Sequence, residues 1–295
     1  MRQITIIGVG LIGGSFALAV KQRGLAARVV GCDRAPVLAR ARQRGGIDAA
    51  VEHPEAAVQG SELVLLATPV GAILEMIERV GPLLPPGSVL ADVGSTKTEI
   101  VARARAVFGA AAGERFVPGH PMAGKEQGGI EQAEAELFQG AKWIITPVAQ
   151  NTAEGATAEG ATAEGGGATQ EFLELIEHIG ARPMVMEAAL HDRVCAWISH
   201  LPQMVSTALA AALVEEFREE PELLEIGGRA LREMTRLGQS PYSMWRDIAL
   251  TNTDNIQDAL ARVEQRLAHI RENLATRELA QEFDQAHALR KKKNC

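Results

Sequence analysis

The chain has 295 residues, of which 46% are hydrophobic and 23% charged, and its formal net charge is −7. This length is enough for two domains, and the composition is that of a globular protein, neither disordered nor fibrous. The acidic balance argues against a nucleic-acid partner, because such proteins usually carry a basic field. We interpret the short basic run 290–293 as a solvated chain end.

Hydropathy and cysteine spacing exclude further classes. No stretch approaches 18 uncharged apolar residues, and the first residues lead directly into a strand-like segment instead of a signal peptide. We therefore expect a cytoplasmic protein with no membrane partner. Cys32, Cys195 and Cys295 are widely spaced and form neither a CxxC pair nor a Cys/His cluster at zinc-ligand spacing. The sequence predicts no disulfide framework and no metal site.

The first half of the chain alternates short β-branched runs with helical patterns, which is typical of βαβ units and a parallel sheet. The patterns predict strands at 4–7, 29–32, 63–66 and 88–91. They predict helices at about 12–24, 35–45 and 71–81. Further strands are predicted at 116–117, 143–145 and 183–186.

Between Gln150 and Thr169 the composition changes to a repeated Thr-Ala-Glu-Gly-Ala unit, which starts at Thr152, Thr157 and Thr162. A five-residue period matches neither a solenoid repeat nor a heptad, and such a polar segment buries too little surface to order itself. We expect a low-complexity surface loop over 150–168, inserted in an N-terminal domain that covers residues 1–186.

The second half has no strand pattern, and helical patterns cover 188–217, 223–237, 244–274 and 278–289. The segment 205–213 is apolar on more than one face, which indicates burial between helices or across a subunit interface. The predicted fold class is therefore α/β. A Rossmann-type dinucleotide-binding domain over 1–186 precedes an all-helical domain over 187–295, through which we expect a homodimer.

A glycine-rich fingerprint, Gly8-Val9-Gly10-Leu11-Ile12-Gly13, follows the first predicted strand and opens a predicted helix. Its first glycine permits a tight turn, its second admits a pyrophosphate, and its third lets helix and strand pack closely. Asp33 ends the second strand, where a carboxylate accepts hydrogen bonds from the adenine ribose and repels a 2′-phosphate, so NAD is favoured. The neighbouring Arg34 can pair with a 2′-phosphate, so NADP stays open.

A dehydrogenase that oxidises a hydroxyl-bearing carbon needs a base within reach of that hydroxyl, and the pKa of histidine suits this task. His120 lies in the segment Gly119-His120-Pro121-Met122-Ala123-Gly124, which follows a predicted strand. A rigid loop at the carboxyl end of a strand is where an α/β sheet places ligands. The residues alone leave two alternatives open, a catalytic base and a structural loop histidine.

Polar residues interrupt the helical half at His191-Asp192-Arg193 and at Ser199-His200-Leu201-Pro202. Burying polar groups without a purpose is costly, although a hydrogen-bonded packing network would also explain them. Arg236 and Arg246 offer guanidinium groups that can bind a carboxylate bidentately, or that form ordinary salt bridges.

Together these segments resemble the prephenate/arogenate (cyclohexadienyl) dehydrogenase family of tyrosine biosynthesis. The resemblance runs from Ile4 to about His287, and the repeat that begins at Thr152 departs from it. Its motifs are Gly8 to Gly14, Thr68-Pro69-Val70, Asp92 to Lys97, Gly119 to Gly124, His191-Asp192, Ser199 to Gln203 and Met244 to Asp247. The combination is specific to this family, whereas the glycine fingerprint alone occurs in many dehydrogenases.

The resemblance implies an oxidative decarboxylation in which hydride leaves the hydroxyl-bearing ring carbon, carbon dioxide leaves the opposite carbon, and the ring becomes aromatic. It implies that His120 accepts a hydrogen bond from the hydroxyl and that Ser95 lies beside the nicotinamide. Substrate contacts are implied for Arg236, at the ring carboxylate, and His200, near the side chain. Pocket-lining or gating positions are implied for Glu126, Asp192 and Trp245, and cofactor contacts for Thr68 and Pro69.

Three alternatives to an NAD-dependent prephenate dehydrogenase stay open. The first is an NADP-dependent arogenate dehydrogenase or an enzyme that uses both substrates. The second is a β-hydroxyacid dehydrogenase, which would need a catalytic lysine early in the helical half. It is disfavoured because that half has no lysine before the terminal run. The third, a non-catalytic NAD-binding regulator, is disfavoured by the set Ser95, His120, His200 and Arg236.

Overall fold

The computed structural model describes residues 1–125, 127–148 and 167–291. Its N-terminal part is built on a six-stranded parallel sheet in the order β3-β2-β1-β4-β5-β6, the order of a dinucleotide-binding Rossmann fold. The strands are β1 (Gln3–Ile7), β2 (Arg28–Cys32), β3 (Ala49–Val51), β4 (Leu63–Leu66), β5 (Val89–Asp92) and β6 (Phe116–Val117).

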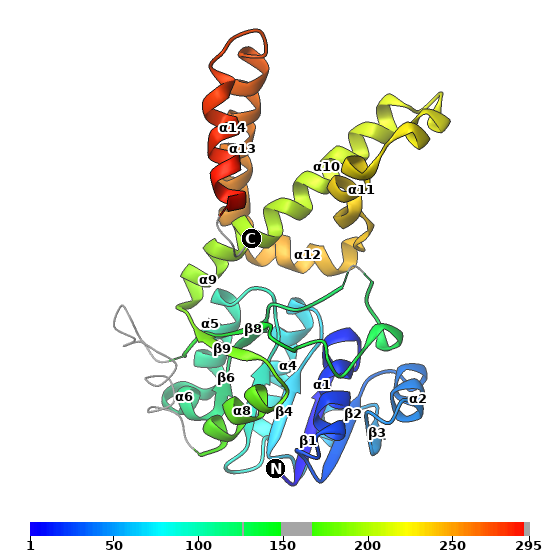
Figure 1. Ribbon diagram of the computed structural model, residues 1–295. Helices are drawn as coiled ribbons and strands as arrows, with labels where there is room; N and C mark the ends of the chain where they lie inside the picture. The colour runs from blue at the N-terminus through cyan, green and yellow to red at the C-terminus, as the bar shows by residue number, and fades with distance from the viewer. Residues whose placement is uncertain (126, 149–166, 292–295) are drawn as a thin grey trace.

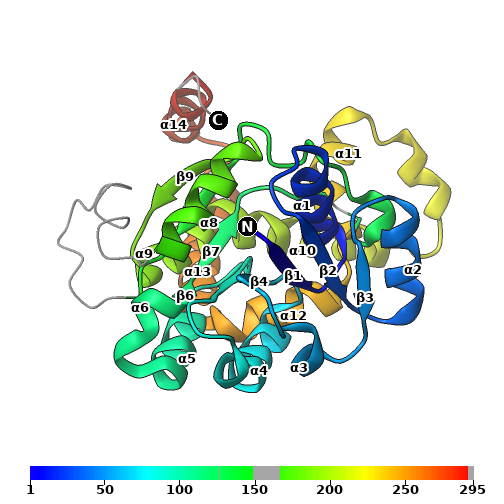
Figure 2. The ribbon, with the colours of Figure 1, turned by 90° about the horizontal axis from the view of Figure 1, so that it is seen from below.

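Helices cover both faces of this sheet, which explains why its central strands are continuous apolar runs. One face packs against α1 (Leu11–Gln22), α2 (Ala35–Gln43) and α8 (Gly167–His178). The other packs against α3 (Pro54–Ala57), α4 (Val70–Val80), α5 (Thr98–Phe108) and α6 (Ala112–Arg115). Figure 2 shows these two helical layers on either side of the strands. The predicted fold class is confirmed.

A second, three-stranded sheet consists of β7 (Gly119–Pro121), β8 (Lys142–Ile145) and β9 (Arg182–Val185). Strands β7 and β8 pair antiparallel, and β8 and β9 pair parallel. Trp143 of β8 is fully buried and packs against the rings of Phe16, Phe138 and Phe172, which fixes this sheet to the main core. The expectation of a loop at His120 is wrong, because His120 is the middle residue of β7.

From Ala188 onward the described elements are helical. They are α9 (Ala188–Cys195), a π-helical turn (Ala196–His200), α10 (Leu201–Glu216), α11 (Arg229–Thr235), α12 (Tyr242–Thr251), α13 (Thr253–Glu272) and α14 (Leu279–Lys291). Short 3₁₀ turns lie at Pro221–Ile226 and Arg236–Gln239. In Figure 1, α10 with α11 and α13 with α14 form two arms that extend away from the sheets.

Two predicted helices are each interrupted in the structure. The predicted helix 223–237 is broken at Gly227 and Gly228, because glycine is a poor helix former. The predicted helix 244–274 is divided at Asn252, whose side chain donates to the backbone oxygen of Asp192. The predicted loop over 150–168 lies outside the described residues up to 166, and α8 begins at Gly167.

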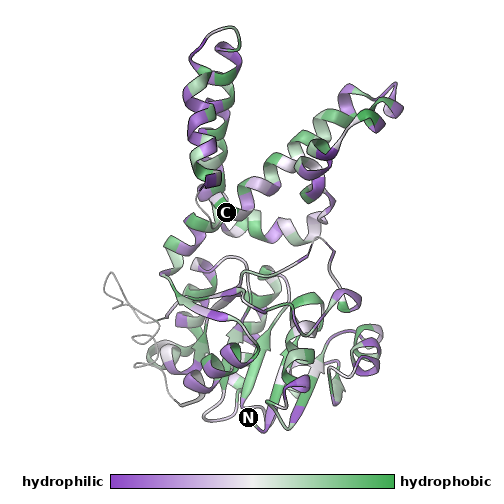
Figure 3. Ribbon diagram, in the orientation of Figure 1, coloured by the Kyte–Doolittle hydropathy of each residue, from purple (hydrophilic) through white to green (hydrophobic). Residues whose placement is uncertain are grey.

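By length and composition alone, the continuous helical run Ala188–Glu216 could cross a membrane. Its first half carries three buried polar side chains, His191, Asp192 and His200, into the junction with the nucleotide-binding part. From Thr207 to Glu216 its residues are exposed or half-buried in a single chain, and the segment contains both hydrophobic and hydrophilic residues (Figure 3). Buried polar contacts of this kind are those of a helix packed against protein.

Candidate active site

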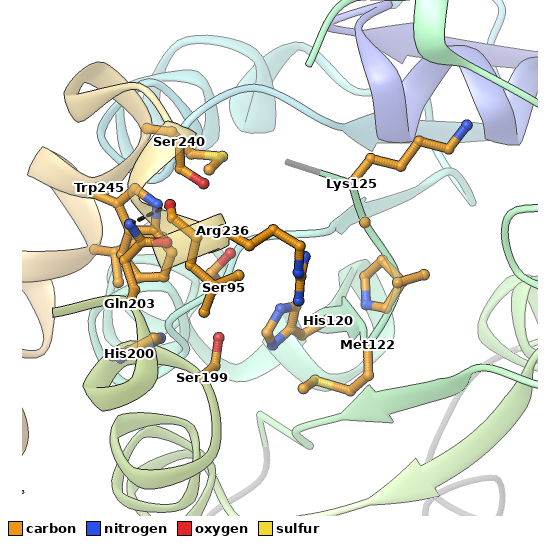
Figure 4. A pocket seen from close by; sticks show the side chains of 16 residues that line it. Ser95, His120, Met122, Lys125, Ser199, His200, Gln203, Arg236, Ser240 and Trp245 are labelled. Carbon is orange, nitrogen blue, oxygen red and sulfur yellow. Dashed lines mark hydrogen bonds between the residues drawn. The ribbon is translucent and has the colours of Figure 1, made fainter. Parts of the chain in front are cut away.

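A cavity of about 360 Å³ lies where the nucleotide-binding part meets the helices. The loop after β5 contributes Ser95, and β7 contributes His120 (Figure 4). The helical half contributes His200, Arg236 and Trp245. The structure thus brings together five of the predicted site residues from distant parts of the sequence. The cavity has the size of an ordinary small-molecule site.

A buried ion pair holds the backbone around both Ser95 and His120. The carboxylate of Asp92 accepts hydrogen bonds from the backbone N–H of Gly94 (2.7 Å) and of Gly119 (3.2 Å). The Lys97 ammonium donates to Asp92 and to the Gly119 carbonyl, the latter at 2.7 Å. Burial lowers the pKa of Lys97 and raises that of Asp92, while their contact opposes both shifts. The loop of Ser95 is therefore fixed to the strand of His120.

His120 is neutral at neutral pH. Burial, followed by the charges of His191, Lys97 and His200, lowers the pKa of its imidazole well below the usual 6.5. Its Nδ1 lies 2.9 Å from Nε2 of His191. A neutral imidazole in a cavity can accept a proton, so the environment suits a general base.

His200 lines the cavity and carries a hydrogen-bond donor that the described residues leave unsatisfied. The Asn252 amide donates to the Asp192 carbonyl at 2.8 Å, and the same amide nitrogen lies 3.1 Å from Nδ1 of His200. Since that nitrogen is a donor, Nδ1 accepts and the proton of the neutral ring is on Nε2. Nε2 is buried and has no hydrogen-bond partner among the described residues. A substrate oxygen would satisfy it.

Burial lowers the pKa of His200 to about 4, mainly through desolvation. In the unfolded chain this pKa returns to about 6.5, so the unfolded state binds more protons between these two values. The free energy of unfolding should therefore fall by about 1.4 kcal/mol per pH unit as the pH drops through this window. Urea unfolding of wild type and His200→Asn at pH 7.5, 6 and 5 tests this. Identical pH dependence in the two proteins would contradict it.

Arg236 brings a positive charge to the cavity, as expected from the sequence. Gln203 of α10 donates to the Leu237 carbonyl at 2.8 Å, which holds the 3₁₀ turn that carries Arg236. In Figure 4 the Arg236 side chain extends across the cavity toward His120. A guanidinium in this position can bind a substrate carboxylate bidentately.

One predicted pocket residue lies behind the cavity, and another lies outside the described residues. Asp192 is buried behind it and accepts hydrogen bonds from the backbone N–H of Lys97 and Thr98 at 2.7 and 2.8 Å. Glu126 lies outside the described residues, and its neighbour Lys125 lines the cavity. No motif indicated Lys125, although it directly follows the segment Gly119 to Gly124.

Cys195 lies beside the two paired histidines. Its Sγ is 3.5 Å from Nε2 of His191 and 4.0 Å from Nδ1 of His120, so the three side chains are close enough to hold a metal ion. The 2.9 Å between the two nitrogens is a hydrogen-bond distance, and burial raises the pKa of the Cys195 thiol to about 12. We interpret the cluster as a hydrogen-bonded one. Sequence spacing did not indicate it.

The glycine-rich turn fits a dinucleotide. Gly8 has a φ of 93°, and a Cβ on Gly13 would lie 2.0 Å from the Gly8 carbonyl oxygen. A Cβ on Gly10 would meet nothing within 4 Å, so the backbone there is open to a ligand. Leu11 and Ile12 form the first turn of α1, whose N-terminus has no side-chain cap. This terminus can receive a phosphate.

The neighbouring strand ends complete this surface. Asp33 accepts hydrogen bonds from the backbone N–H of Val9 (2.8 Å) and of Arg34 (2.7 Å), so its carboxylate is fixed beside the glycine-rich turn. Thr68 and Pro69 follow β4, and the buried Thr68 hydroxyl has no hydrogen-bond partner within the described ranges. A cofactor could satisfy this orphaned hydroxyl.

A Rossmann domain whose cofactor surface adjoins a cavity with a neutral histidine and an arginine defines a nicotinamide-dinucleotide-dependent dehydrogenase of an anionic substrate. Two family profiles match the chain. They are "Prephenate dehydrogenase, nucleotide-binding domain" over residues 16–161 and "Prephenate dehydrogenase, dimerization domain" over residues 187–288. The chain belongs to the prephenate dehydrogenase family.

Individual relatives agree with this assignment. A prephenate dehydrogenase of Lactococcus lactis is 30% identical over 92% of this chain and 70% of its own length. A cyclohexadienyl dehydrogenase of Zymomonas mobilis is 31% identical over 85% of this chain and 81% of its own. The crystal structure of Aquifex aeolicus prephenate dehydrogenase with hydroxyphenyl propionate and NAD⁺ superposes with a TM-score of 0.84 at 29% identity, covering 98% of this chain and 97% of that one.

Proposed function

We propose that this protein is an NAD-dependent prephenate dehydrogenase, which converts prephenate to 4-hydroxyphenylpyruvate and carbon dioxide in tyrosine biosynthesis. The observation that carries the proposal is the single cavity in which Ser95 and His120 of the nucleotide-binding part meet His200 and Arg236 of the helical part. Relatives named for this activity, and one solved with NAD⁺ and a hydroxyphenyl ligand, support it.

In the proposed reaction the cavity residues bind the ring and polarise its hydroxyl. Neutral His120 accepts the hydrogen bond of the hydroxyl. It stabilises the positive charge that develops on the hydroxyl as the C–H and C–CO₂ bonds break. Ser95 lies beside the same hydroxyl, and Arg236 holds the ring carboxylate. The Nε2–H of His200 donates to an oxygen of the substrate side chain, and Trp245 closes the cavity beside it. The ring ends as an aromatic phenol.

The cofactor surface consists of Gly8, Gly10, Leu11, Ile12, Gly13, Asp33, Arg34, Thr68 and Pro69. When bound, NAD supplies the hydride acceptor. The fixed Asp33 carboxylate favours NAD over NADP, because it repels a 2′-phosphate.

The test is the absorbance at 340 nm with purified protein and each combination of prephenate or arogenate with NAD or NADP. We expect the highest kcat/KM with prephenate and NAD. The relative named cyclohexadienyl dehydrogenase favours a second candidate, an enzyme that also accepts arogenate. Highest activity with arogenate and NADP would replace our proposal by the arogenate enzyme. No turnover in any combination, with NAD still bound, would instead favour a non-catalytic regulator.

Arg236→Gln should mainly raise the KM for prephenate, by about tenfold or more, with a smaller effect on kcat. The reason is that a charge-assisted bond to the ring carboxylate acts in the ground state and the transition state alike. Steady-state kinetics of wild type, Arg236→Gln and the exposed Arg229→Gln check this. An unchanged KM would give Arg236 a structural role only.

The helical part has the exposed apolar surface expected of a homodimer. Large hydrophobic side chains on its arms are exposed in the single chain, among them Val214, Ile226, Leu267, Leu274 and Phe283. The match to a dimerization domain supports a second copy as the occupant. Light scattering after size exclusion should give twice the 31.5 kDa chain mass. A monomer at micromolar concentration would contradict this.

We place the enzyme in the cytoplasm, as for a biosynthetic dehydrogenase.

A further inference from the structure

We propose that His191 and Asp192 are positioning residues that set the tautomer of His120 and stabilise its protonated form. The inference rests on the proposed function of His120 as the base, and it concerns two residues behind the cavity. Asp192 was predicted to line or gate the pocket, and His191 was a part of the same motif with no assigned role.

Asp192, His191 and His120 contact one another in this order, and we call them the positioning chain. The carboxylate of Asp192 is its fixed end. Its Oδ1 accepts from the Lys97 backbone N–H at 2.7 Å, and its Oδ2 accepts from the Thr98 backbone N–H at 2.8 Å. Thr98 is the first residue of α5 and Lys97 precedes it, so both donors lie at the N-terminus of this helix. A helix N-terminus stabilises negative charge. Burial raises the pKa of Asp192, but the hydrogen bonds from His191, Thr98 and Lys97 outweigh it and leave this pKa low. Asp192 is therefore an ionised acceptor.

An ionised acceptor determines the proton on His191. Nδ1 of His191 lies 2.8 Å from Oδ1 of Asp192, and a carboxylate can only accept, so this nitrogen carries the proton. In the neutral ring, Nε2 of His191 is then an acceptor. It lies 2.9 Å from Nδ1 of His120, which must donate to it. The remaining nitrogen of His120, Nε2, is left with a free lone pair.

This arrangement fixes which nitrogen of His120 acts as the base. Isolated imidazole exchanges between two tautomers, and only the one with its proton on Nδ1 can accept at Nε2. When His120 is protonated, Nδ1–H still donates to His191, and the Asp192 carboxylate stabilises the positive charge through that ring. The logic is that of a carboxylate that orients a catalytic histidine, with one additional imidazole between them.

Burial makes this role distinct from simple packing. His191 is 0% exposed and Asp192 is 1% exposed, so water cannot replace either contact. The charged and titratable groups that face His120 are Lys97, His191, Cys195, His200 and, across the cavity, Arg236 and Lys125. Among the described residues His191 makes the short contact to the His120 ring, at 2.9 Å, whereas the Cys195 sulfur lies 4.0 Å from the same nitrogen.

The test uses three variants of one helix face. His191→Leu removes the acceptor, and we expect kcat/KM with prephenate to fall at least tenfold. The acidic limb of its pH profile should move to lower pH, because protonated His120 loses its stabilising partner. In His191→Gln a side-chain oxygen can take the place of Nε2, and we expect activity within about threefold of wild type. Ala188→Gly, at a buried position one turn earlier on α9, is the matched packing control and should leave the pH limb unchanged.

A second readout does not depend on turnover. Nitrogen-15 NMR of the histidine rings should show His120 protonated on Nδ1 in wild type and in His191→Gln, and a mixture of tautomers in His191→Leu. Circular dichroism and NAD binding verify that each variant is folded.

Three results would overturn the inference. One is wild-type kcat/KM and pH profile in His191→Leu. Another is an equal loss in His191→Leu and Ala188→Gly with the pH limb unmoved, since that is the signature of packing. The third is a wild-type His120 protonated on Nε2. If wild type turns over neither substrate but the tautomer pattern is as expected, the proposed function fails while the positioning chain stands.

Discussion

His120→Asn is expected to lower kcat for prephenate by about 100-fold or more, which corresponds to at least about 2.7 kcal/mol of transition-state stabilisation. The amide of asparagine reaches the position of Nδ1 but has no atom where Nε2 stands. The contact to His191, 2.9 Å in wild type, can therefore persist while the proton acceptor is lost. Binding of NAD should change little, because the cofactor surface is made by other segments.

The control is His53→Asn, the same substitution at an exposed histidine before α3. It should leave kcat and KM unchanged. Stopped-flow and steady-state rates, together with NAD titration by fluorescence, separate chemistry from binding. Turnover of His120→Asn within a few-fold of wild type would remove His120 from the mechanism. A parallel loss of NAD affinity would mean that the substitution distorts β7 and its neighbouring loop.

The Rossmann half could be predicted because its signals are local. Apolar runs such as 63–66 are buried strands, and the glycine spacing from Gly8 to Gly13 reports backbone requirements that neighbouring residues impose. The short elements were missed, among them β3 and α3, because three or four residues give no measurable period. Strand β7 was also missed, because its extended shape comes from pairing with β8, more than twenty residues further on.

Residues that line the cavity were easier to predict than the residues that support them. Ser95, His120, His200, Arg236 and Trp245 all line one cavity, as expected from the family resemblance. His191 and Lys97 also lie in motifs of the resemblance, yet charged or polar side chains are normally exposed, and sequence alone does not indicate their burial. The placement of Asp192 behind the cavity depends on α5 packing against α9, a tertiary contact that no local pattern shows.

Lys97→Met should lower the free energy of unfolding by about 3–5 kcal/mol, the cost of leaving one partner of a buried ion pair uncompensated. Both side chains of the pair, Lys97 and Asp92, are 0% exposed. The substitution also leaves the Gly119 carbonyl without the donor it has at 2.7 Å. Since Asp92 in the variant can regain neutrality by taking up a proton, the deficit relative to wild type should narrow between pH 7.5 and pH 5.

The matched control is Lys21→Met, because Lys21 also pairs with an aspartate, Asp48 at 2.6 Å, but both side chains are about one third exposed. An exposed pair contributes less than about 1 kcal/mol, so urea unfolding should distinguish the two lysines clearly. Similar losses in both variants would show that the Lys97–Asp92 pair is worth no more than a surface contact. In that case the alignment of Ser95 with His120 would depend on the backbone pairing of β7, and the activity of folded Lys97→Met should stay near wild type.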